Sequence, residues 1–131
     1  MDLKDVYLHP DHQHLLTFQW EKKTYKLQCL PFGLSAAPRG FTKLLKPVVG
    51  FQRQIGCRLI IYLDNLLIMH QDKTLLKKIT QLTFQLFESS GLIVNLKKSI
   101  PTPAQNLEFL GFQLCSMAMR VSLPSEKLHK I

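Results

Sequence analysis

The fold is decided by one stretch of sequence, RLIIYLDNLLIM at residues 58–69. Two short runs rich in Ile and Leu meet there at a pair of polar residues, Asp64 and Asn65. Short apolar runs joined by residues that tolerate tight turns are typical of the two strands of a buried β-hairpin. The stretch therefore predicts a hairpin with Asp64 at its tip, where the carboxylate is either a turn residue or a metal ligand held by a rigid element.

The whole chain has the size and composition of one folded domain. Its 131 residues are 46% hydrophobic and 20% charged, which is ordinary for a globular protein. Seventeen Lys and Arg against nine Asp and Glu give a net charge of +8. Such a charge favours polyanionic partners such as nucleic acid or an anionic membrane surface, and a basic domain without such a partner is the alternative.

The cysteines and the apolar runs bear on the compartment. Cys29, Cys57 and Cys115 are an odd number with wide spacing, which fits no disulfide framework and indicates a reducing environment. The longest apolar run is interrupted at Asp64 and is too short to span a bilayer, and the first residues lack the layout of a signal peptide. We therefore expect no membrane partner and a location inside the cell, in the nucleus or the cytoplasm.

Strands and helices are mixed along the rest of the chain. Before the central hairpin, the pattern predicts a strand over 2–8, a turn at 9–11, a hairpin with strands 15–20 and 24–29, and a helix capped by Ser35 that Pro47 kinks or shortens. After it, the pattern predicts a helix from Asp72 to Gly91, a strand over 92–94, a closing hairpin with strands 107–114 and 119–123, and a short helix from Ser125. This order predicts an α+β domain over residues 1–131, with a mostly antiparallel sheet backed by helices on one face.

Two acidic residues are candidates for a metal site. Asp2 lies on the first predicted strand and Asp64 at the hairpin tip, so antiparallel pairing could bring them together. Two carboxylates at one sheet edge repel each other unless a cation neutralises them, and oxygen-only ligands suit magnesium. The spacing alone does not establish that they meet. A zinc site is a second possibility, with spacing that matches no standard pattern, and its ligands would be His9, His12, His14 and Cys29.

Five short motifs occur in the order of the palm motifs of reverse transcriptases. They are DLKDVY at 2–7, LPFGLSAAP at 30–38, YLDN at 62–65, GLIVNLKKS at 91–99 and FLG at 109–111. The chain resembles a retrotransposon reverse transcriptase palm over its whole length and looks closest to those of tyrosine-recombinase retroelements. The resemblance implies a polymerase palm that adds a dNTP to a primer 3′-hydroxyl on an RNA or DNA template, with two Mg²⁺ or Mn²⁺ ions.

The resemblance also implies roles for single positions. Asp2 and Asp64 match the two metal-binding aspartates, and Lys98, with Lys97 as the alternative, matches a lysine that protonates pyrophosphate. The implied nucleotide-binding residues are Leu3, Tyr7, Phe32, Gly33 and Asn65, and the implied primer grip is Phe109, Leu110 and Gly111. Without the resemblance, Tyr7 fits a core aromatic and the adjacent lysines fit a solvated loop pair.

One position departs from the family pattern. The hairpin motif normally carries two aspartates, and the second is Asn65 here, whose amide keeps an acceptor oxygen but cannot neutralise a cation. We also expect the fingers and thumb of the polymerase to lie outside residues 1–131. Both features predict impaired or absent polymerase activity in this chain. The alternatives are a catalytically dead palm that binds nucleic acid through its positive charge and a basic interaction module.

Overall fold

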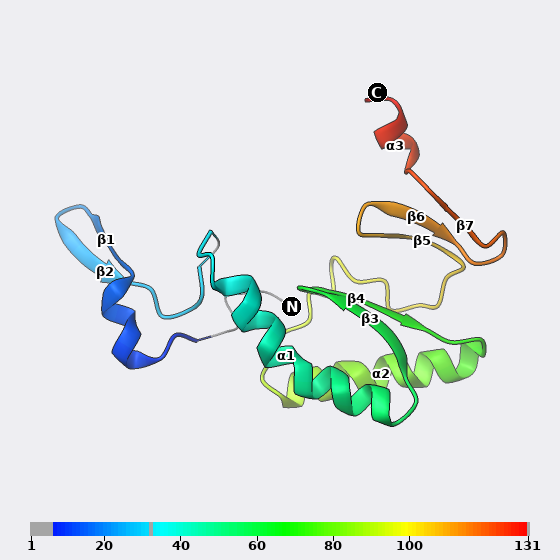
Figure 1. Ribbon diagram of the computed structural model, residues 1–131, viewed down its shortest axis with the longest axis horizontal. Helices are drawn as coiled ribbons and strands as arrows, with labels where there is room; N and C mark the ends of the chain where they lie inside the picture. The colour runs from blue at the N-terminus through cyan, green and yellow to red at the C-terminus, as the bar shows by residue number, and fades with distance from the viewer. Residues whose placement is uncertain (1–6, 32, 131) are drawn as a thin grey trace.

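The computed structural model describes residues 7–31 and 33–130, and Figure 1 shows the arrangement of their helices and strands. All strand pairs are antiparallel and form three sheets, β1–β2, β3–β4 and β5–β6–β7. The predicted α+β class is therefore confirmed, although the strands are divided among three sheets. The elements are η2 (Pro10–Leu15), β1 (Thr17–Trp20), β2 (Lys23–Lys26), α1 (Ala37–Gln54), β3 (Arg58–Tyr62), β4 (Asn65–Met69), α2 (Lys73–Ser89), β5 (Asn106–Phe109), β6 (Phe112–Cys115), β7 (Arg120–Ser122) and α3 (Ser125–Leu128).

The β3–β4 hairpin carries α1 and α2 on one of its faces (Figure 1). Leu59 pairs with Ile68 and Ile61 pairs with Leu66 across the two strands. All four side chains pack with Val49 of α1 in one hydrophobic cluster. The predicted hairpin and the placement of the helices on one face are confirmed.

The hydrophobic core joins both helices to this hairpin. One cluster contains Phe41 and Leu45 of α1, Phe87 of α2, and Leu92 just after α2. All four side chains are buried, and partly buried residues of β3 and β4 pack against them. The position of the hairpin is therefore fixed by apolar packing from two helices.

Helix α1 differs from the prediction at its start and at Pro47. Its N-cap is Ala36, which makes no side-chain capping bond, so Ser35 is not the cap that we predicted. The helix also continues past Pro47 to Gln54. An internal proline costs a helix about 3 kcal/mol, and burial of the apolar face of α1, which includes Phe41 and Leu45, offsets that cost.

Both long helices end in the same hydrogen-bonded motif. After α1, the N–H groups of Gly56 and Cys57 donate to the carbonyls of Arg53 and Gln52 at 3.1 and 3.0 Å. After α2, the N–H groups of Gly91 and Leu92 donate in the same pattern to Glu88 and Phe87, both at 3.0 Å. This is the Schellman motif, and its left-handed position is occupied by glycines with φ of +90° and +81°.

The start of α2 is capped as predicted. The Asp72 carboxylate accepts hydrogen bonds from the N–H groups of Thr74 at 2.7 Å and Leu75 at 3.2 Å. These bonds satisfy two of the amides that a helix leaves without an internal partner. The helix therefore begins at Lys73, directly after this aspartate.

A buried polar contact links the two long helices. The Gln52 side-chain amide of α1 donates to the Thr83 hydroxyl of α2 at 2.7 Å, and Thr83 in turn donates to the Ile79 carbonyl at 2.8 Å. Gln52 is fully buried, and its Oε1 atom has no hydrogen-bond partner among the described residues. Arg53 adds a further link, because its guanidinium donates to the Leu59 carbonyl of β3 at 3.3 Å.

The predicted strand over residues 92–94 is wrong. The chain there is irregular and pairs with no strand in the described residues. Leu92 is nevertheless buried and Val94 is partly buried against the same core cluster. The apolar residues here are therefore explained by their packing in the core and not by a strand. The backbone N–H of Leu92 is used instead in the hydrogen bonds that end α2.

The N-terminal part contains a short helix where we predicted a turn at residues 9–11. The 3₁₀-helix η2 has Pro10 at its first position, and the ring of His9 accepts a hydrogen bond from the Asp11 N–H at 3.3 Å. Of the strand predicted over residues 2–8, the part up to residue 6 lies outside the described residues, and Tyr7 makes a single bridge with Cys29. The predicted hairpin that follows is confirmed as β1–β2.

The C-terminal part is a three-stranded meander followed by a short helix. The stretch predicted as one strand over 107–114 is instead two strands, β5 and β6, joined at Leu110 and Gly111. These two residues have φ of +51° and +78°, which is the backbone of a tight type I′ turn. The prediction of a single strand was wrong. The alternation of apolar residues continues on both sides of the turn, so the pattern does not show where the first strand ends.

The cysteines agree with the absence of a disulfide framework. Cys29, Cys57 and Cys115 are all free thiols. Within residues 7–31 and 33–130, no helix combines the length and the apolar character needed to cross a bilayer.

Candidate functional site

A cavity of about 510 Å³ lies at the tip of the β3–β4 hairpin. Its walls come from β4, α2, the irregular segment over 94–104 and strand β5. Four of the predicted site residues line it, and they come from separate parts of the chain: Asp64, Asn65, Lys98 and Phe109. The structure therefore brings together the residues of three motifs that are far apart in the sequence.

The turn of the hairpin consists of Leu63 and Asp64. Tyr62 and Asn65 form the last strand pair, so Asn65 belongs to β4 and the predicted turn over Asp64 and Asn65 is displaced by one residue. Leu63 has φ of +53°, a left-handed conformation that costs an ordinary residue about 1–2 kcal/mol. The packed strands on both sides hold this strained turn, which leaves the Asp64 carboxylate exposed.

Asn65 is the first residue of β4, and its pairing with Tyr62 of β3 fixes its backbone. Its partner Tyr62 is exposed, and its neighbour Leu66 packs toward the helices. An asparagine side chain offers one acceptor oxygen and two N–H donors but no charge. Near the hairpin tip, the cavity therefore has one carboxylate and one amide.

Lys98 lies in a turn that is organised by Asn95. The backbone N–H of Lys98 donates to the Asn95 carbonyl at 3.2 Å and to the Asn95 side-chain oxygen at 3.3 Å. The Ser99 hydroxyl donates to the same carbonyl at 2.7 Å. These bonds hold the backbone of Lys98 at the cavity, while its side chain is exposed.

Asn95 is a positioning residue that the sequence reasoning missed. It belongs to the motif at 91–99, whose resemblance implies no role for this position. The available signal was its identity, because an asparagine side chain commonly accepts a hydrogen bond from a backbone N–H a few residues later. Glu108 was also missed, and it adds a second carboxylate residue to the cavity lining.

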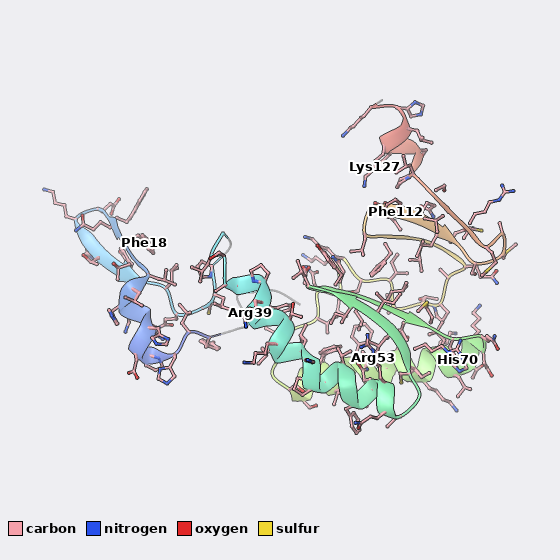
Figure 2. All side chains as sticks on the ribbon, in the orientation of Figure 1. Phe18, Arg39, Arg53, His70, Phe112 and Lys127 are labelled. Atoms are coloured by element: carbon pink, nitrogen blue, oxygen red, sulfur yellow. The ribbon has the colours of Figure 1, made fainter. Side chains whose placement is uncertain are left out.

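Of the predicted primer-grip residues, only Phe109 lines the cavity. Leu110 and Gly111 form the turn that follows it. The Lys127 ammonium of α3 donates to the Gly111 carbonyl at 3.2 Å, and Figure 2 shows the position of Lys127 on the C-terminal helix. The turn after Phe109 is therefore held by a residue outside the predicted motif.

Several predicted nucleotide-binding residues are not at this cavity. Tyr7 is 77% exposed, so it is not a core aromatic, and it does not line the cavity. The chain around it is held by a hydrogen bond from Leu8 N–H to the Gln28 carbonyl at 2.6 Å. Gly33 has φ of +85° and is likewise absent from the lining. The predictions for Asp2, Leu3 and Phe32 lie outside the described residues.

The zinc alternative receives no support from the described histidines. His9 and His12 have their ring centroids 5.7 Å apart, and the His9 ring lies 3.5 Å from the Asp11 carboxylate. Among residues 7–31 and 33–130, no three His, Cys, Asp or Glu side chains gather as metal ligands.

The fold matches that of solved reverse transcriptases. The foamy viral protease-reverse transcriptase in complex with double-stranded DNA matches with a TM-score of 0.78 and 28% sequence identity, over 95% of this chain and 25% of that one. The same kind of enzyme in complex with an RNA/DNA hybrid gives a TM-score of 0.79 and 27% identity, over 95% and 16% of the two chains. The fold and the cavity thus define the class as a polymerase palm of the reverse transcriptase type.

Sequence comparison gives the same family. The model of the family described as "Reverse transcriptase (RNA-dependent DNA polymerase)" matches residues 3–114, and the chain belongs to the reverse transcriptase family. The Gag-Pol polyprotein of Walleye dermal sarcoma virus is 31% identical over 124 residues, which are 94% of this chain and 7% of that protein. The transposon Tf2-7 polyprotein of Schizosaccharomyces pombe is 24% identical over 118 residues, which are 87% and 9%.

These comparisons confirm the family that the five motifs indicated, and they include both a retrotransposon and viruses. Reverse transcriptases generally use divalent metal ions. The chain spans only a small share of each of these relatives.

Proposed function

We propose that this chain is the catalytic palm of an RNA-directed DNA polymerase, which joins a deoxynucleotide to a primer 3′-hydroxyl. One observation carries the proposal above all others. A single cavity is lined by Asp64, Asn65, Lys98 and Phe109, which belong to three separate motifs of this family. The cavity lining is otherwise largely apolar, so the convergent polar side chains of Asp64, Asn65 and Lys98 on an apolar wall are typical of a ligand-binding site.

The proposed ligands of the metal are Asp64 and Asp2. Asp64 is exposed on a turn between two packed strands, and its carboxylate makes no hydrogen bond or ion pair with the other described residues. A free carboxylate on a rigid turn fits an oxygen-preferring cation such as Mg²⁺ or Mn²⁺. Two such ions would activate the primer hydroxyl and stabilise the leaving pyrophosphate.

We infer that Asn65 reduces the affinity for the second cation. A carboxylate at this position would add a negative charge beside Asp64, whereas the amide oxygen adds only a dipole. Glu108 contributes a carboxylate residue to the same cavity, but it belongs to β5 and not to the hairpin. The proposed enzyme therefore has an impaired metal site.

Lys98 is the proposed general acid of the reaction. An ammonium group at this cavity can donate a proton to pyrophosphate as it leaves, and proton donors in such positions contribute roughly 10²–10⁴-fold to rates. The turn held by Asn95 keeps the Lys98 backbone at the cavity wall. Phe109, which lines the same cavity, would contact the primer end.

The other partners follow from the same proposal. The solved relatives were complexed with double-stranded DNA and with an RNA/DNA hybrid, which suggests a template-primer duplex as the partner of this chain as well. The chain spans 25% of the first of these proteins. We propose that clamping of the dNTP and holding of the duplex require fingers and thumb segments beyond the palm, because positioning supplies much of the rate in phosphoryl transfer.

A second candidate function is nucleic-acid binding without catalysis. The net charge of +8 supports it, and so does the amide at position 65. Binding through Lys and Arg releases counterions from the nucleic acid, so the affinity for a primer-template should fall steeply with salt concentration. This function would persist in a chain whose catalytic site has lost its second acid.

Primer extension distinguishes the two candidates. The 131-residue chain is incubated with a DNA primer on an RNA template, dNTPs, and either Mg²⁺ or Mn²⁺. We expect weak extension that Asp64→Ala abolishes and that Asn65→Asp increases at least tenfold, because the added charge improves binding of the second cation. Asn106→Asp, at the start of β5 and not itself a lining residue of the cavity, is the matched control for added charge.

The outcomes separate cleanly. If neither the unmodified chain nor Asn65→Asp extends the primer, polymerase activity of this chain is excluded, and salt-dependent binding measured by fluorescence anisotropy then decides for the second candidate. If Asn106→Asp increases extension as much as Asn65→Asp, the amide at the hairpin is not the cause of weak activity.

A further inference from the structure

The β1–β2 hairpin presents aromatic side chains to solvent. Phe18 pairs with Tyr25 and Trp20 pairs with Lys23 across its strands. Direct partners in an antiparallel pair share one face, and successive residues alternate between the two faces. The three aromatic residues therefore lie on the same side, with exposed fractions of 50% for Phe18, 66% for Trp20 and 43% for Tyr25. We call these three residues the aromatic face.

The aromatic face is preorganised. The rings of Phe18 and Tyr25 are stacked, with centroids 5.5 Å apart and planes inclined by 19°. The hairpin turn is formed by Glu21 and Lys22, which have φ of +47° and +63° as in the tight turns that match strand twist. The strands are thus held in register, and the rings of Phe18 and Tyr25 are already aligned with each other in the unbound chain.

The hairpin stands apart from the polymerase-type cavity. In Figure 1 it lies at one end of the molecule, away from β3–β4, and Figure 2 shows Phe18 on it. All residues of β1 and β2 are exposed, so no described segment covers either face. An exposed aromatic cluster of this kind in a folded protein indicates a binding surface.

Positive charge lies beside the aromatic face. Lys23 shares this face as the partner of Trp20, and Lys22 lies in the adjoining turn next to the acidic residue Glu21. We call Lys22 and Lys23 the hairpin lysines; the third lysine, Lys26, alternates to the opposite face. Among the described residues, neither hairpin lysine forms an ion pair with a carboxylate. Lysine is depleted in the cores of protein interfaces, whereas aromatic rings beside lysines suit stacked bases and their phosphates.

We propose that the β1–β2 hairpin binds single-stranded nucleic acid, with bases stacked on the aromatic face and phosphates near the hairpin lysines. Duplex DNA would bind this surface less well because its bases are already stacked in the helix. The proposal does not rest on polymerase activity, since the hairpin contributes no residue to the cavity at Asp64.

The single tryptophan of the chain makes a direct test possible. Trp20 is the only tryptophan, so the fluorescence of the protein reports on the aromatic face alone. The 131-residue chain is titrated with a 15-nucleotide oligothymidylate at low salt, and with a duplex of equal length. We expect saturable quenching of Trp20 emission by the single strand and a weaker effect of the duplex.

Three variants locate the binding. Phe18→Ala removes a stacking ring and should raise Kd about tenfold or more, while Phe18→Tyr keeps an aromatic ring and should leave Kd within about twofold. Gln19→Ala, on the opposite face of the same strand, is the matched control and should also bind as the unmodified chain does. Circular dichroism verifies that each variant is folded.

The proposal is overturned by any of three results. They are the absence of quenching at low salt, equal Kd values for Phe18→Ala and the unmodified chain, or a dimer in sedimentation whose aromatic face is already covered by a second copy. Asp64→Ala serves to separate this proposal from polymerase function, because it should bind oligothymidylate with unchanged Kd whether or not the chain extends primers.

Discussion

Gln52 is a buried polar residue whose hydrogen-bonding groups are only partly satisfied. Its amide nitrogen bonds to Thr83, yet its carbonyl oxygen is buried without a partner in the described part of the chain. A buried acceptor without a hydrogen bond costs about 1–3 kcal/mol. One net hydrogen bond contributes about 1 kcal/mol, so the two effects are of similar size and opposite sign.

Replacing this glutamine by leucine should therefore do little harm. We expect Gln52→Leu to leave the free energy of unfolding within about 1 kcal/mol of the unmodified chain or to raise it, because Thr83 keeps its bond to the Ile79 carbonyl. Gln52→Ala creates a cavity and should lower the same free energy by about 2–4 kcal/mol. Urea denaturation measures both values. Equal losses in the two variants would mean that the bond to Thr83 outweighs the cost of the orphaned oxygen.

For single residues, the sequence predicted which side chains line the cavity better than it predicted the backbone conformation of the hairpin turn. Asp64 and Lys98 do line one cavity, as the motifs implied. The left-handed residue of the turn is Leu63, which side-chain chemistry does not favour there, so the turn was placed one residue too late. Strain of this kind is imposed by the packed strands and leaves no local signal in the sequence.

At the scale of elements, glycines mark the ends of both long helices. Gly91 ends α2 with φ of +81°, a conformation that other residues adopt only with strain. Gly50, in contrast, lies inside α1, where a Cβ atom would meet nothing within 4 Å. The same substitution should therefore have opposite effects at the two positions.

We expect Gly91→Ala to lower the free energy of unfolding by about 1 kcal/mol, because alanine is strained at positive φ. Gly50→Ala should raise it by roughly 0.5–1 kcal/mol through the better helix propensity of alanine. Thermal denaturation followed by circular dichroism measures both. A loss of stability in Gly50→Ala would show that α1 is distorted at that residue, near the internal proline.

Elements with a local cause were predicted correctly, and those that depend on distant partners were not. The cap at Asp72 and the stop at Gly91 depend on residues within a few positions, and both are confirmed. The segment over 92–94 has strand-like residues but no strand beside it, so its state depends on the rest of the fold. Pro47 shows the reverse case, because tertiary burial of α1 outweighs a local signal that ends helices.

At the scale of the whole molecule, one core carries the β3–β4 hairpin. Phe87 is almost fully buried and packs with residues of α1 and with Leu92, while residues of β3 and β4 cover the same cluster. Loss of this side chain should therefore loosen both helices and the hairpin together.

We expect Phe87→Ala to lower the free energy of unfolding by about 3–5 kcal/mol, which is a large share of the stability of a domain of this size. Phe51→Ala, at a half-exposed phenylalanine of α1, is the matched control and should change it by less than 1 kcal/mol. Chemical denaturation followed by circular dichroism in the far and in the near ultraviolet gives two probes. Equal effects of the two substitutions would contradict a shared core at Phe87.

The class of the fold could be predicted from the sequence, but the arrangement of the strands could not. The order of strands and helices was sufficient for an α+β class with helices on one face of the hairpin. Division into three sheets depends on which strand edges meet, and edge pairing is decided by the tertiary contacts of the whole chain. The same limit applies to Tyr7, whose motif position gave no information about its distance from the cavity.

The three sheets have a consequence for how the chain folds. Every named strand pairs with its neighbour along the sequence, so each sheet closes only a short loop. Proteins built from such local contacts have low contact order and fold quickly, because little chain entropy is lost before the first pairs form. The slow step should then be the docking of α1 and α2 on β3–β4, since it joins residues as distant as Gln52 and Thr83. The β3–β4 hairpin would thus form early, and the cavity at its tip would be completed late.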